Sequence, residues 1–518
     1  MKENGRKNYI IKNASSQMTA SLTQSLLGFV SRRVFLLCLG EELLGLNGFL
    51  TSIIGMLSIA ELGVGEAINF SLYEPLAKND TDKVAAIMRL YKKLYIVIAC
   101  VIGVLGVALF PFLHLLVETQ IPMRYVYNAY FLFLLDTFLS YCLAYNRNII
   151  SADQKDYIVI NIDNISQILL SLLQIALLYL TKNFYIYLGI KVAVTFIRNL
   201  YIYIRAKKMY PYLGEKRELP ALSKEYTGKL KENVKALFVT RISYFCVSGT
   251  DNLLLSSFVS LSSIAIYNNY VTIFTLFNRT FHTIFDKTRS VIGNYIVING
   301  KTNTYPLFKR MFFLNFLLTS YTSIGIFVVS NAVICAWLGN HMVWTLPLVG
   351  ILVFNNYSRY ILQTCEAFRG AMGLYSPRPF VKFLALVEGL LNLAVSLGLI
   401  FLMENKILAV FLGTAVSTVI STVCVPWIVY KFIFERPLGD FFRLYFKYLV
   451  ICLAALVLSQ LIFDIVCVQR SIANVFIGIG VCTAVTGIVY VLCFFRTEEF
   501  RYYWNLVKSF LRKITKSK

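Results

Sequence analysis

The sequence predicts an all-α, polytopic membrane protein with about 14 transmembrane helices, arranged as two six-helix lobes followed by a C-terminal helix pair. Three observations support this fold class: the composition, the recurrence of apolar stretches and the placement of positive charge. Of the 518 residues, 58% are hydrophobic and only 15% are charged, which leaves too few polar groups to cover the surface of a soluble protein. Lipid is therefore the natural solvent of this chain.

Apolar stretches of about 20 residues, enough to cross the hydrocarbon core of a bilayer, recur along the whole chain between short polar joints. In an N-terminal lobe of residues 1–204, the predicted spans lie near 15–38, 44–72, 94–117, 125–146, 158–181 and 184–204. A basic cytoplasmic linker, 205–235, precedes a C-terminal lobe, 236–430, with spans near 236–258, 264–286, 311–338, 343–367, 380–403 and 406–430. The remaining residues, 431–518, hold the terminal helix pair, 446–466 and 472–495, and a basic cytoplasmic tail.

Positive charge alternates from one joint to the next. The chain carries 50 Lys and Arg against 27 Asp and Glu. With the N-terminus in the cytoplasm, the inner segments hold 39 of the 50 basic residues and the outer joints hold 4, as the positive-inside rule requires. The basic excess therefore reports membrane orientation, with both termini cytoplasmic, and we expect no nucleic-acid partner.

The sequence offers no sign of enzymatic chemistry. Its eleven cysteines lie singly in apolar runs, without the short paired spacing of metal or redox sites, so we expect no metal and no other cofactor. No phosphate-binding glycine loop is present, which argues against ATP hydrolysis by this chain. The longest outer joint, His114 to Arg124, contains Glu118 as its only acid. We therefore expect no catalytic residues.

Polar side chains recur at helical spacing on five of the predicted spans. A helix that faces lipid has no reason to carry such a stripe, whereas a helix that lines a watery cavity does. Gln24 belongs to the stripe of the first span, and Asn268 begins the longest stripe, on the eighth span. Small polar residues also hold membrane helices together, so a single Ser or Thr on these stripes does not establish a cavity.

Five arginines within the spans carry more weight than these uncharged groups. They are Arg32, Arg33, Arg241, Arg279 and Arg359. An arginine at the bilayer centre costs roughly 2.5 to 3.5 kcal/mol, so these side chains need water or partners. A cavity provides water; the alternatives are an ion-pair network with Glu61, Asp251 and Glu366 or, for the two arginines near an outer end, snorkelling to the interface.

The sign of the charge on the stripes indicates the class of ligand. Arginine binds phosphate and carboxylate groups through two parallel hydrogen bonds. Because arginines outnumber carboxylates on the stripes, a cavity built from them suits an anionic headgroup. An exporter of cationic drugs would favour the opposite sign.

The stretch Leu43 to Asp80, which reads LLGLNGFLTSIIGMLSIAELGVGEAINFSLYEPLAKND and follows Arg33-Val34-Phe35, resembles the second span of Wzx-type polysaccharide flippases. The resemblance extends to the tenth span, the span count and the charge layout. It implies membership of the multidrug, oligosaccharidyl-lipid and polysaccharide exporter superfamily, which also contains lipid II flippases. Many Wzx-type proteins have twelve spans, whereas this sequence predicts fourteen.

The resemblance implies translocation of an undecaprenyl-pyrophosphate-linked oligosaccharide repeat unit across the bacterial cytoplasmic (inner) membrane by alternating access, for capsule, lipopolysaccharide or other surface polysaccharide. It also implies membrane lipids as partners, together with a polysaccharide polymerase and glycosyltransferases. The expected cavity residues are Arg32, Arg33, Arg241, Arg279, Arg359, Asn268 and Gln24. Glu61, Asp251 and Glu366 are the candidates for coupling to a proton or sodium gradient or for partners of the arginines.

Three alternatives stay open at this point. The first is a multidrug or cation antiporter of the same superfamily, which would need an acidic, aromatic cavity. The second is a membrane glycosyltransferase or polymerase, which generally needs larger outer loops than this chain predicts. The third, lipid II flipping, differs only in its substrate.

Overall fold

The computed structural model describes residues 3–61, 64–214, 228, 250–374, 379–467 and 472–516. These residues are almost all helical, as predicted, and no strand occurs among them. The chain divides into two compact units, Met1–Ala265 and Ile266–Lys518. Most of the predicted linker, 205–235, lies outside the described residues.

The first unit is a bundle of long helices. Its helices are α1 (Glu3–Leu57), α2 (Val64–Ala77), α3 (Thr81–Leu109), α4 (Leu113–Leu116), α5 (Met123–Ala152), α6 (Asp156–Thr181), α7 (Phe184–Met209) and α9 (Thr250–Phe258), with the first residues of α10 (Leu261–Asn299). Within this bundle α1 packs on α6, and α5 packs on α3 and α7.

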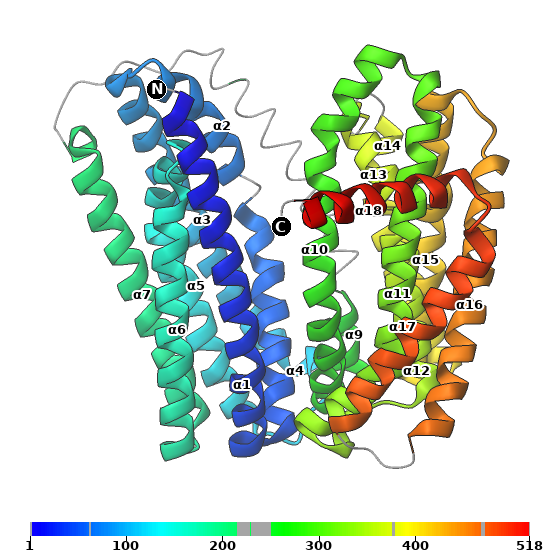
Figure 1. Ribbon diagram of the computed structural model, residues 1–518. Helices are drawn as coiled ribbons and strands as arrows, with labels where there is room; N and C mark the ends of the chain where they lie inside the picture. Colours follow the sequence, from blue (N-terminus) through cyan, green and yellow to red (C-terminus); the bar gives the residue numbers. More distant parts are fainter. Residues whose placement is uncertain are drawn as a thin grey trace. The chain divides into compact units, whose positions relative to one another are not determined.

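Gly40 divides α1 into the two spans that the sequence predicts at 15–38 and 44–72. Its φ of 83° and ψ of 175° interrupt the helix, and glycine adopts such a positive φ without a steric penalty. Figure 1 shows the dark-blue N-terminal helix ending at one edge of the bundle, where the next blue helix begins and runs back. The predicted span 44–72 was wrong as a single helix, because a 3₁₀ turn at Ser58–Glu61 ends it before α2.

The second unit holds the rest of the helices. These are the remainder of α10, then α11 (Tyr305–Leu338), α12 (Leu346–Tyr360), α13 (Gln363–Ala371), α14 (Pro379–Leu402), α15 (Lys406–Val429), α16 (Gly439–Val466), α17 (Ile472–Phe494) and α18 (Glu498–Lys516). The strongest packing is between α14 and α15, and the predicted terminal pair, α16 and α17, packs on α11.

Aromatic rings fill the core of the second unit. Phe308 and Phe312 of α11 have ring centroids 5.6 Å apart, and Phe316 of the same helix stacks on Tyr448 of α16 at 4.4 Å. Phe494 of α17 closes the cluster at 5.6 Å from Phe316. Edge-to-face and offset contacts of this kind add to the burial of large side chains, so the terminal pair is held by a continuous apolar core.

Ten helices among the described residues are long and apolar enough to cross a membrane. The chain is therefore a multi-pass membrane protein, as predicted. The count of fourteen stays a prediction, partly because the predicted span 236–258 falls mainly outside the described residues. The predicted span 343–367 is divided into α12 and α13 by the turn at residues 361–362.

Candidate functional site

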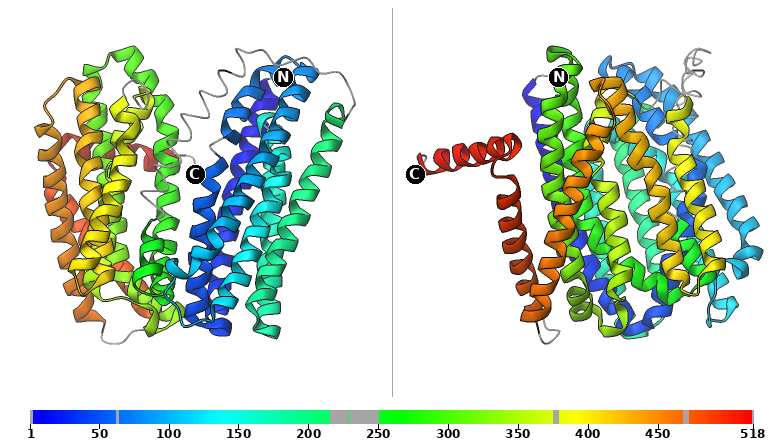
Figure 2. Two further views of the ribbon diagram at one scale, coloured as in Figure 1. Left: turned by 180° about the vertical axis from the view of Figure 1, so that it is seen from behind. Right: turned by 90° about the vertical axis from the view of Figure 1, so that its right-hand side faces the viewer.

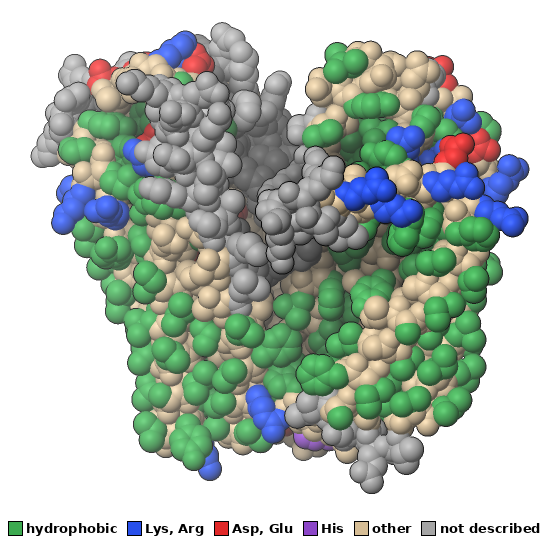
Figure 3. Space-filling view, in the orientation of Figure 1, with side chains coloured by type: hydrophobic (Ala, Val, Ile, Leu, Met, Phe, Trp, Pro, Cys, Tyr) green, Lys and Arg blue, Asp and Glu red, His purple; other side chains and the backbone are tan. Residues whose placement is uncertain are grey.

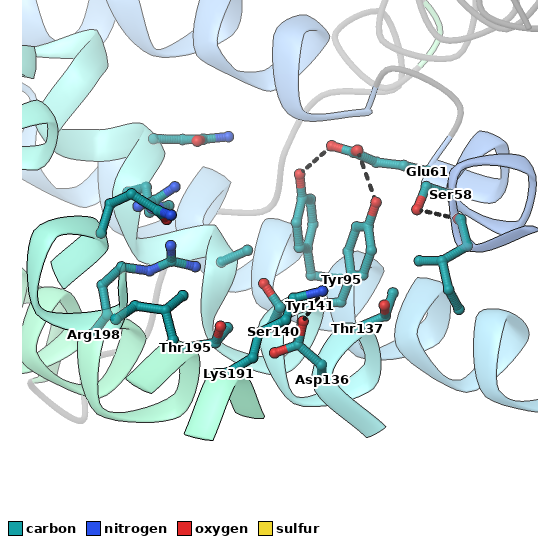
Figure 4. A pocket seen from close by; sticks show the side chains of 16 residues that line it. Ser58, Glu61, Tyr95, Asp136, Thr137, Ser140, Tyr141, Lys191, Thr195 and Arg198 are labelled. Atoms are coloured by element: carbon teal, nitrogen blue, oxygen red, sulfur yellow. Dashed lines mark hydrogen bonds and ion pairs between the residues drawn. The ribbon is translucent and has the colours of Figure 1, made fainter. Parts of the chain in front are cut away.

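A cavity of about 480 Å³ lies inside the first unit (Figure 4). Its walls come from the end of α1, the turn Ser58–Glu61, α3, α5, α6 and α7. The charged side chains that line it are Glu61, Asp136, Arg147, Lys191 and Arg198. Ionisable groups are expensive inside membrane helices and usually mark a pathway or a binding site. We therefore take this cavity as the candidate site.

Glu61 ends the 3₁₀ turn, and tyrosines bind its carboxylate. Tyr95 of α3 donates a hydrogen bond to Oε1 at 2.6 Å, and Tyr141 of α5 donates to Oε2 at 3.3 Å (Figure 4). Gly65 makes this approach possible, because a Cβ at that position would lie 2.8 Å from the Tyr95 hydroxyl and 3.0 Å from Oε1. The described donors to Glu61 are thus hydroxyl groups, whereas the sequence suggested an arginine.

Lys191 of α7 faces Asp136 near the middle of α5. The distance from Nζ to Oδ2 is 3.6 Å, and the ammonium group also lies 4.3 Å from the ring centroid of Phe133. The Asp136 side chain is 14% exposed, and its Oδ1 has no hydrogen-bond partner among the described atoms. This carboxylate therefore keeps acceptor capacity on the cavity wall.

Arg147 and Arg198 share one carboxylate. Both pair with Asp163 of α6, with 3.6 Å from the Arg198 Nε to Oδ1. Asp163 carries one negative charge against the two positive charges, and the carboxylate of Asp136 also acts on Arg198. A second anion with several acceptor oxygens, such as a phosphate, would satisfy the remaining donors of both guanidinium groups.

Charged groups therefore lie on both sides of the cavity. The carboxylate of Glu61 with its tyrosines lies on one side, and Arg198 lies on the other (Figure 4). Uncharged hydrogen-bonding groups, including Thr137, Ser140 and Thr195, line the wall as well. Such a lining can hold a polar, partly anionic group out of contact with lipid.

The predicted residues of the first unit lie elsewhere, apart from Glu61. Arg32 in α1 donates from Nη2 to the carbonyl oxygen of Ala265 at 2.9 Å. Arg33 is exposed and Gln24 is half-buried on the same helix, and none of the three lines this cavity. Asp251 is buried near the start of α9. Arg241 lies outside the described residues.

In the second unit, Arg359 of α12 has a partner that the sequence analysis did not name. Its Nη2 lies 3.7 Å from Oε1 of Glu388, a buried residue of α14 that also accepts a hydrogen bond from Ser421. Glu366, which we had considered as a partner, pairs with Arg369 within α13 at 3.4 Å.

The two remaining predicted residues lie on α10. Asn268 is half-buried. The backbone of Arg279 is helical, but its side chain lies outside the part of the chain that the structure describes.

Sequence reasoning missed Asp136, Arg147, Lys191 and Arg198 as cavity residues. It also missed Asp163, which pairs with both arginines. A signal was present, since Lys191, Thr195 and Arg198 follow the i, i+4, i+7 spacing of one helix face. Their carboxylate partners stand alone in their own spans, so only the tertiary structure pairs them.

No protein-family model and none of the curated proteins matches this chain. Several solved structures match it. The lipid II flippase MurJ, in an inward closed conformation, matches with a TM-score of 0.64 and 13% identity over 95% of this chain and 99% of that one. An inward-facing multidrug resistance MATE family transporter of the MOP superfamily gives a TM-score of 0.57 and 12% identity over 81% and 98%.

A MATE transporter from Vibrio cholerae gives a TM-score of 0.54 and 13% identity, over 84% of this chain and 99% of that one. At these identities the similarity concerns the fold. The chain therefore has the polytopic helical fold that a lipid II flippase shares with MATE family transporters of the MOP superfamily.

Proposed function

We propose that the protein is a flippase that moves an undecaprenyl-pyrophosphate-linked oligosaccharide repeat unit across the bacterial cytoplasmic membrane by alternating access, for surface polysaccharide synthesis. One observation carries the proposal: a cavity inside a membrane-spanning bundle where two arginines share a single carboxylate. Such a wall is suited to an anionic headgroup.

The length of the structural match supports a flippase over a drug exporter. The lipid II flippase covers 95% of this chain, whereas the two MATE transporters cover 81% and 84%. Each of those structures is itself matched over 98% or 99% of its length. The chain thus shares the longer architecture with the flippase, which favours a lipid-linked substrate.

The physical task is to carry a pyrophosphate and sugars past hydrocarbon. Each polar group that loses its water without a partner costs roughly 2 to 7 kcal/mol, so unassisted crossing is negligible. In our proposal Arg147 and Arg198 bind the phosphate oxygens in place of water, and the hydroxyl groups of the wall bind the first sugar. The polyprenyl tail stays in the lipid.

We extend the substrate path to the predicted residues that do not line this cavity, namely Arg32, Arg33, Arg241, Arg279, Arg359, Gln24 and Asn268. Glu61, Asp251 and Glu366 remain our candidates for ion coupling. A polysaccharide polymerase and glycosyltransferases are the proposed partners.

Orientation with cytoplasmic termini is part of the proposal. It is supported by the basic side chains that gather near the N-terminal end of the first unit, above a broad hydrophobic belt, on the face seen in Figure 3. Lys207 and Lys208, in the last turn of α7, belong to this end by sequence.

The test is the accumulation of the lipid-linked repeat unit on the inner leaflet of cells that lack the protein, with plasmid rescue. We expect wild type to restore surface polysaccharide, and Arg198→Ala, Arg279→Ala and Arg359→Ala to fail while reaching the membrane at normal levels. Arg124→Ala, which removes an exposed arginine from an outer joint, is the matched control and should rescue.

Two outcomes would overturn the proposal. Unchanged surface polysaccharide in the deletion strain, together with sensitivity to cationic dyes, would assign the protein to drug export. Loss of peptidoglycan synthesis with accumulation of lipid II would show that lipid II, and not a polysaccharide repeat unit, is the substrate.

A further inference from the structure

Helix α18 leaves the end of α17 and runs across it, away from the other helices of its unit (Figure 2, right). The link between the two helices is short, since α17 ends at Phe494 and α18 begins at Glu498. α17 is one of the helices that can span a membrane. Its end therefore fixes the start of α18 near the surface of the bilayer.

α18 has two chemically distinct faces. Phe500, Tyr503, Trp504 and Val507 follow the i, i+3, i+4, i+7 spacing of one face. The opposite face carries Arg501, Asn505, Lys508 and Arg512. After Glu499 the sequence contains no acidic residue, so every charged side chain of the polar face is basic.

The first two turns of α18 are fixed to the beginning of α11. Glu499 pairs with Lys309 at 3.3 Å, and the hydroxyl of Tyr503 donates to the carbonyl oxygen of Arg310 at 3.2 Å. The guanidinium of Arg310 also lies 4.3 Å from the ring centroid of Tyr502. These contacts set the direction in which the helix leaves the unit.

Beyond this attachment, α18 exposes large apolar side chains. Trp504 is 51% exposed, Leu506 51% and Val507 49%. A contiguous apolar surface of this kind is unfavourable in water. Trp and Tyr are, in contrast, the residues that prefer the headgroup layer of a membrane.

Further cations surround the root of the helix. Arg496 lies over the ring of Phe495, with 5.1 Å to the centroid, and Lys447 of α16 lies 5.6 Å from the ring centroid of Phe494. Together with the basic face of α18 they form a juxtamembrane cluster, which attracts anionic lipids.

We propose that α18 is an interfacial helix that binds the anionic lipids of its own leaflet, with its apolar face at the acyl boundary and its basic face among the headgroups. The chemistry matches that of amphipathic helices that lie in the plane of a membrane. Each basic residue contributes on the order of fivefold to the association with an anionic surface. This inference does not depend on the transported substrate.

The experiment uses the full-length protein in nanodiscs of phosphatidylcholine alone or of phosphatidylcholine mixed with phosphatidylglycerol. Chymotrypsin cleavage after Tyr502, Trp504 and Leu506 is followed by mass spectrometry. We expect cleavage in the mixed lipid to be at least several-fold slower than in phosphatidylcholine. The triple variant Arg501→Gln/Lys508→Gln/Arg512→Gln should lose this difference.

A second triple variant, Arg89→Gln/Lys92→Gln/Lys93→Gln, removes the same number of exposed charges from α3 and should retain the difference. Native mass spectrometry of the purified proteins gives an independent readout, and the α18 variant should carry less bound phosphatidylglycerol than the α3 variant. Equal cleavage rates of the wild type in the two lipids would overturn the proposal. That result would indicate that the apolar face of α18 binds a soluble partner instead of lipid. Equal loss of bound lipid in both variants would also overturn it.

Discussion

The two units of this protein use their interiors differently. The first encloses a cavity with charged walls, in which Glu61 is held by tyrosines and Asp163 by two arginines. The second packs aromatic rings of α11, α16 and α17 against one another, and the Arg359–Glu388 pair lies on other helices, α12 and α14.

In our interpretation, the charged interior of the first unit serves substrate binding and the aromatic interior of the second unit serves the stability of the fold. Buried charges cost free energy and stabilise little on their own, so a unit that concentrates them does so for a ligand or for ion movement. Interlocking rings stabilise a fold, and the phenylalanines among them offer no hydrogen bonds to a polar substrate. We therefore expect mutations of the charged cavity wall in the first unit to alter transport, and mutations of the aromatic core in the second unit to alter stability.

Both units also depend on close helix contacts at a glycine, and here we expect the largest effects. A Cβ on Gly45 would lie 1.9 Å from the carbonyl oxygen of Leu261, and one on Gly413 would lie 2.0 Å from Oγ of Ser396. Gly45→Ala and Gly413→Ala should each abolish folded protein, because backbone atoms must shift to admit the methyl group. The yield of monodisperse protein in detergent is the measurement.

Gly55→Ala and Gly398→Ala are the matched controls, since nothing lies within 4 Å of a Cβ at either position. Normal yield of Gly45→Ala or Gly413→Ala would show that the helices are not in such close contact.

The aromatic core should give the next largest effect. Phe316 is fully buried among Tyr448, Tyr490 and Phe494, so Phe316→Ala should lower the free energy of unfolding by about 3 to 5 kcal/mol. Phe446→Ala, at a side chain 55% exposed on the same unit, should change it little. Thermal unfolding in detergent would reveal the difference, and equal melting temperatures would remove the supporting role that we assign to this core.

The smallest effect on stability should come from replacing one carboxylate in each unit by the amide of the same shape. This pair of variants also tests the difference between the two units most directly. Glu61→Gln keeps an oxygen that accepts from Tyr95, and Glu388→Gln keeps one that accepts from Ser421. Each should cost roughly 1 kcal/mol or less, because the hydrogen bond survives and Arg359 is 36% exposed.

In the transport assay the two variants should differ. Cells with Glu61→Gln should accumulate the lipid-linked intermediate, because Glu61 lines the candidate substrate cavity of the first unit. Cells with Glu388→Gln should not accumulate it. The reverse result would move the functional role to the second unit.

Much of the fold was predictable from hydropathy. The predicted spans beginning at residues 184, 406 and 472 start where α7, α15 and α17 start, because the change from a polar joint to an apolar run coincides with the first residue of each helix. The break at Ser58–Glu61 was not predictable in this way. The apolar pattern continues through it, and a change in chain direction leaves no trace in hydropathy.

The site was less predictable than the fold. The sequence marks Arg359 as an arginine within a predicted span, but its partner Glu388 lies 29 positions away on another helix, and nothing in either span specifies the pairing. The stripe of Lys191 and Arg198 was readable from its spacing, whereas the position of Asp163 between Arg147 and Arg198 follows from how α5, α6 and α7 pack.

The sharing of Asp163 has a consequence for how mutations combine. A substitution of either arginine leaves the other one with a full counter-charge, so each single change is partly compensated by the neighbour. Loss of the carboxylate instead removes the partner of both cations, and their mutual repulsion adds to the loss of each pair. The effects of substitutions at Arg147, Asp163 and Arg198 are therefore not additive. Whether a second substitution harms the protein or rescues it depends on which of the three residues was changed first.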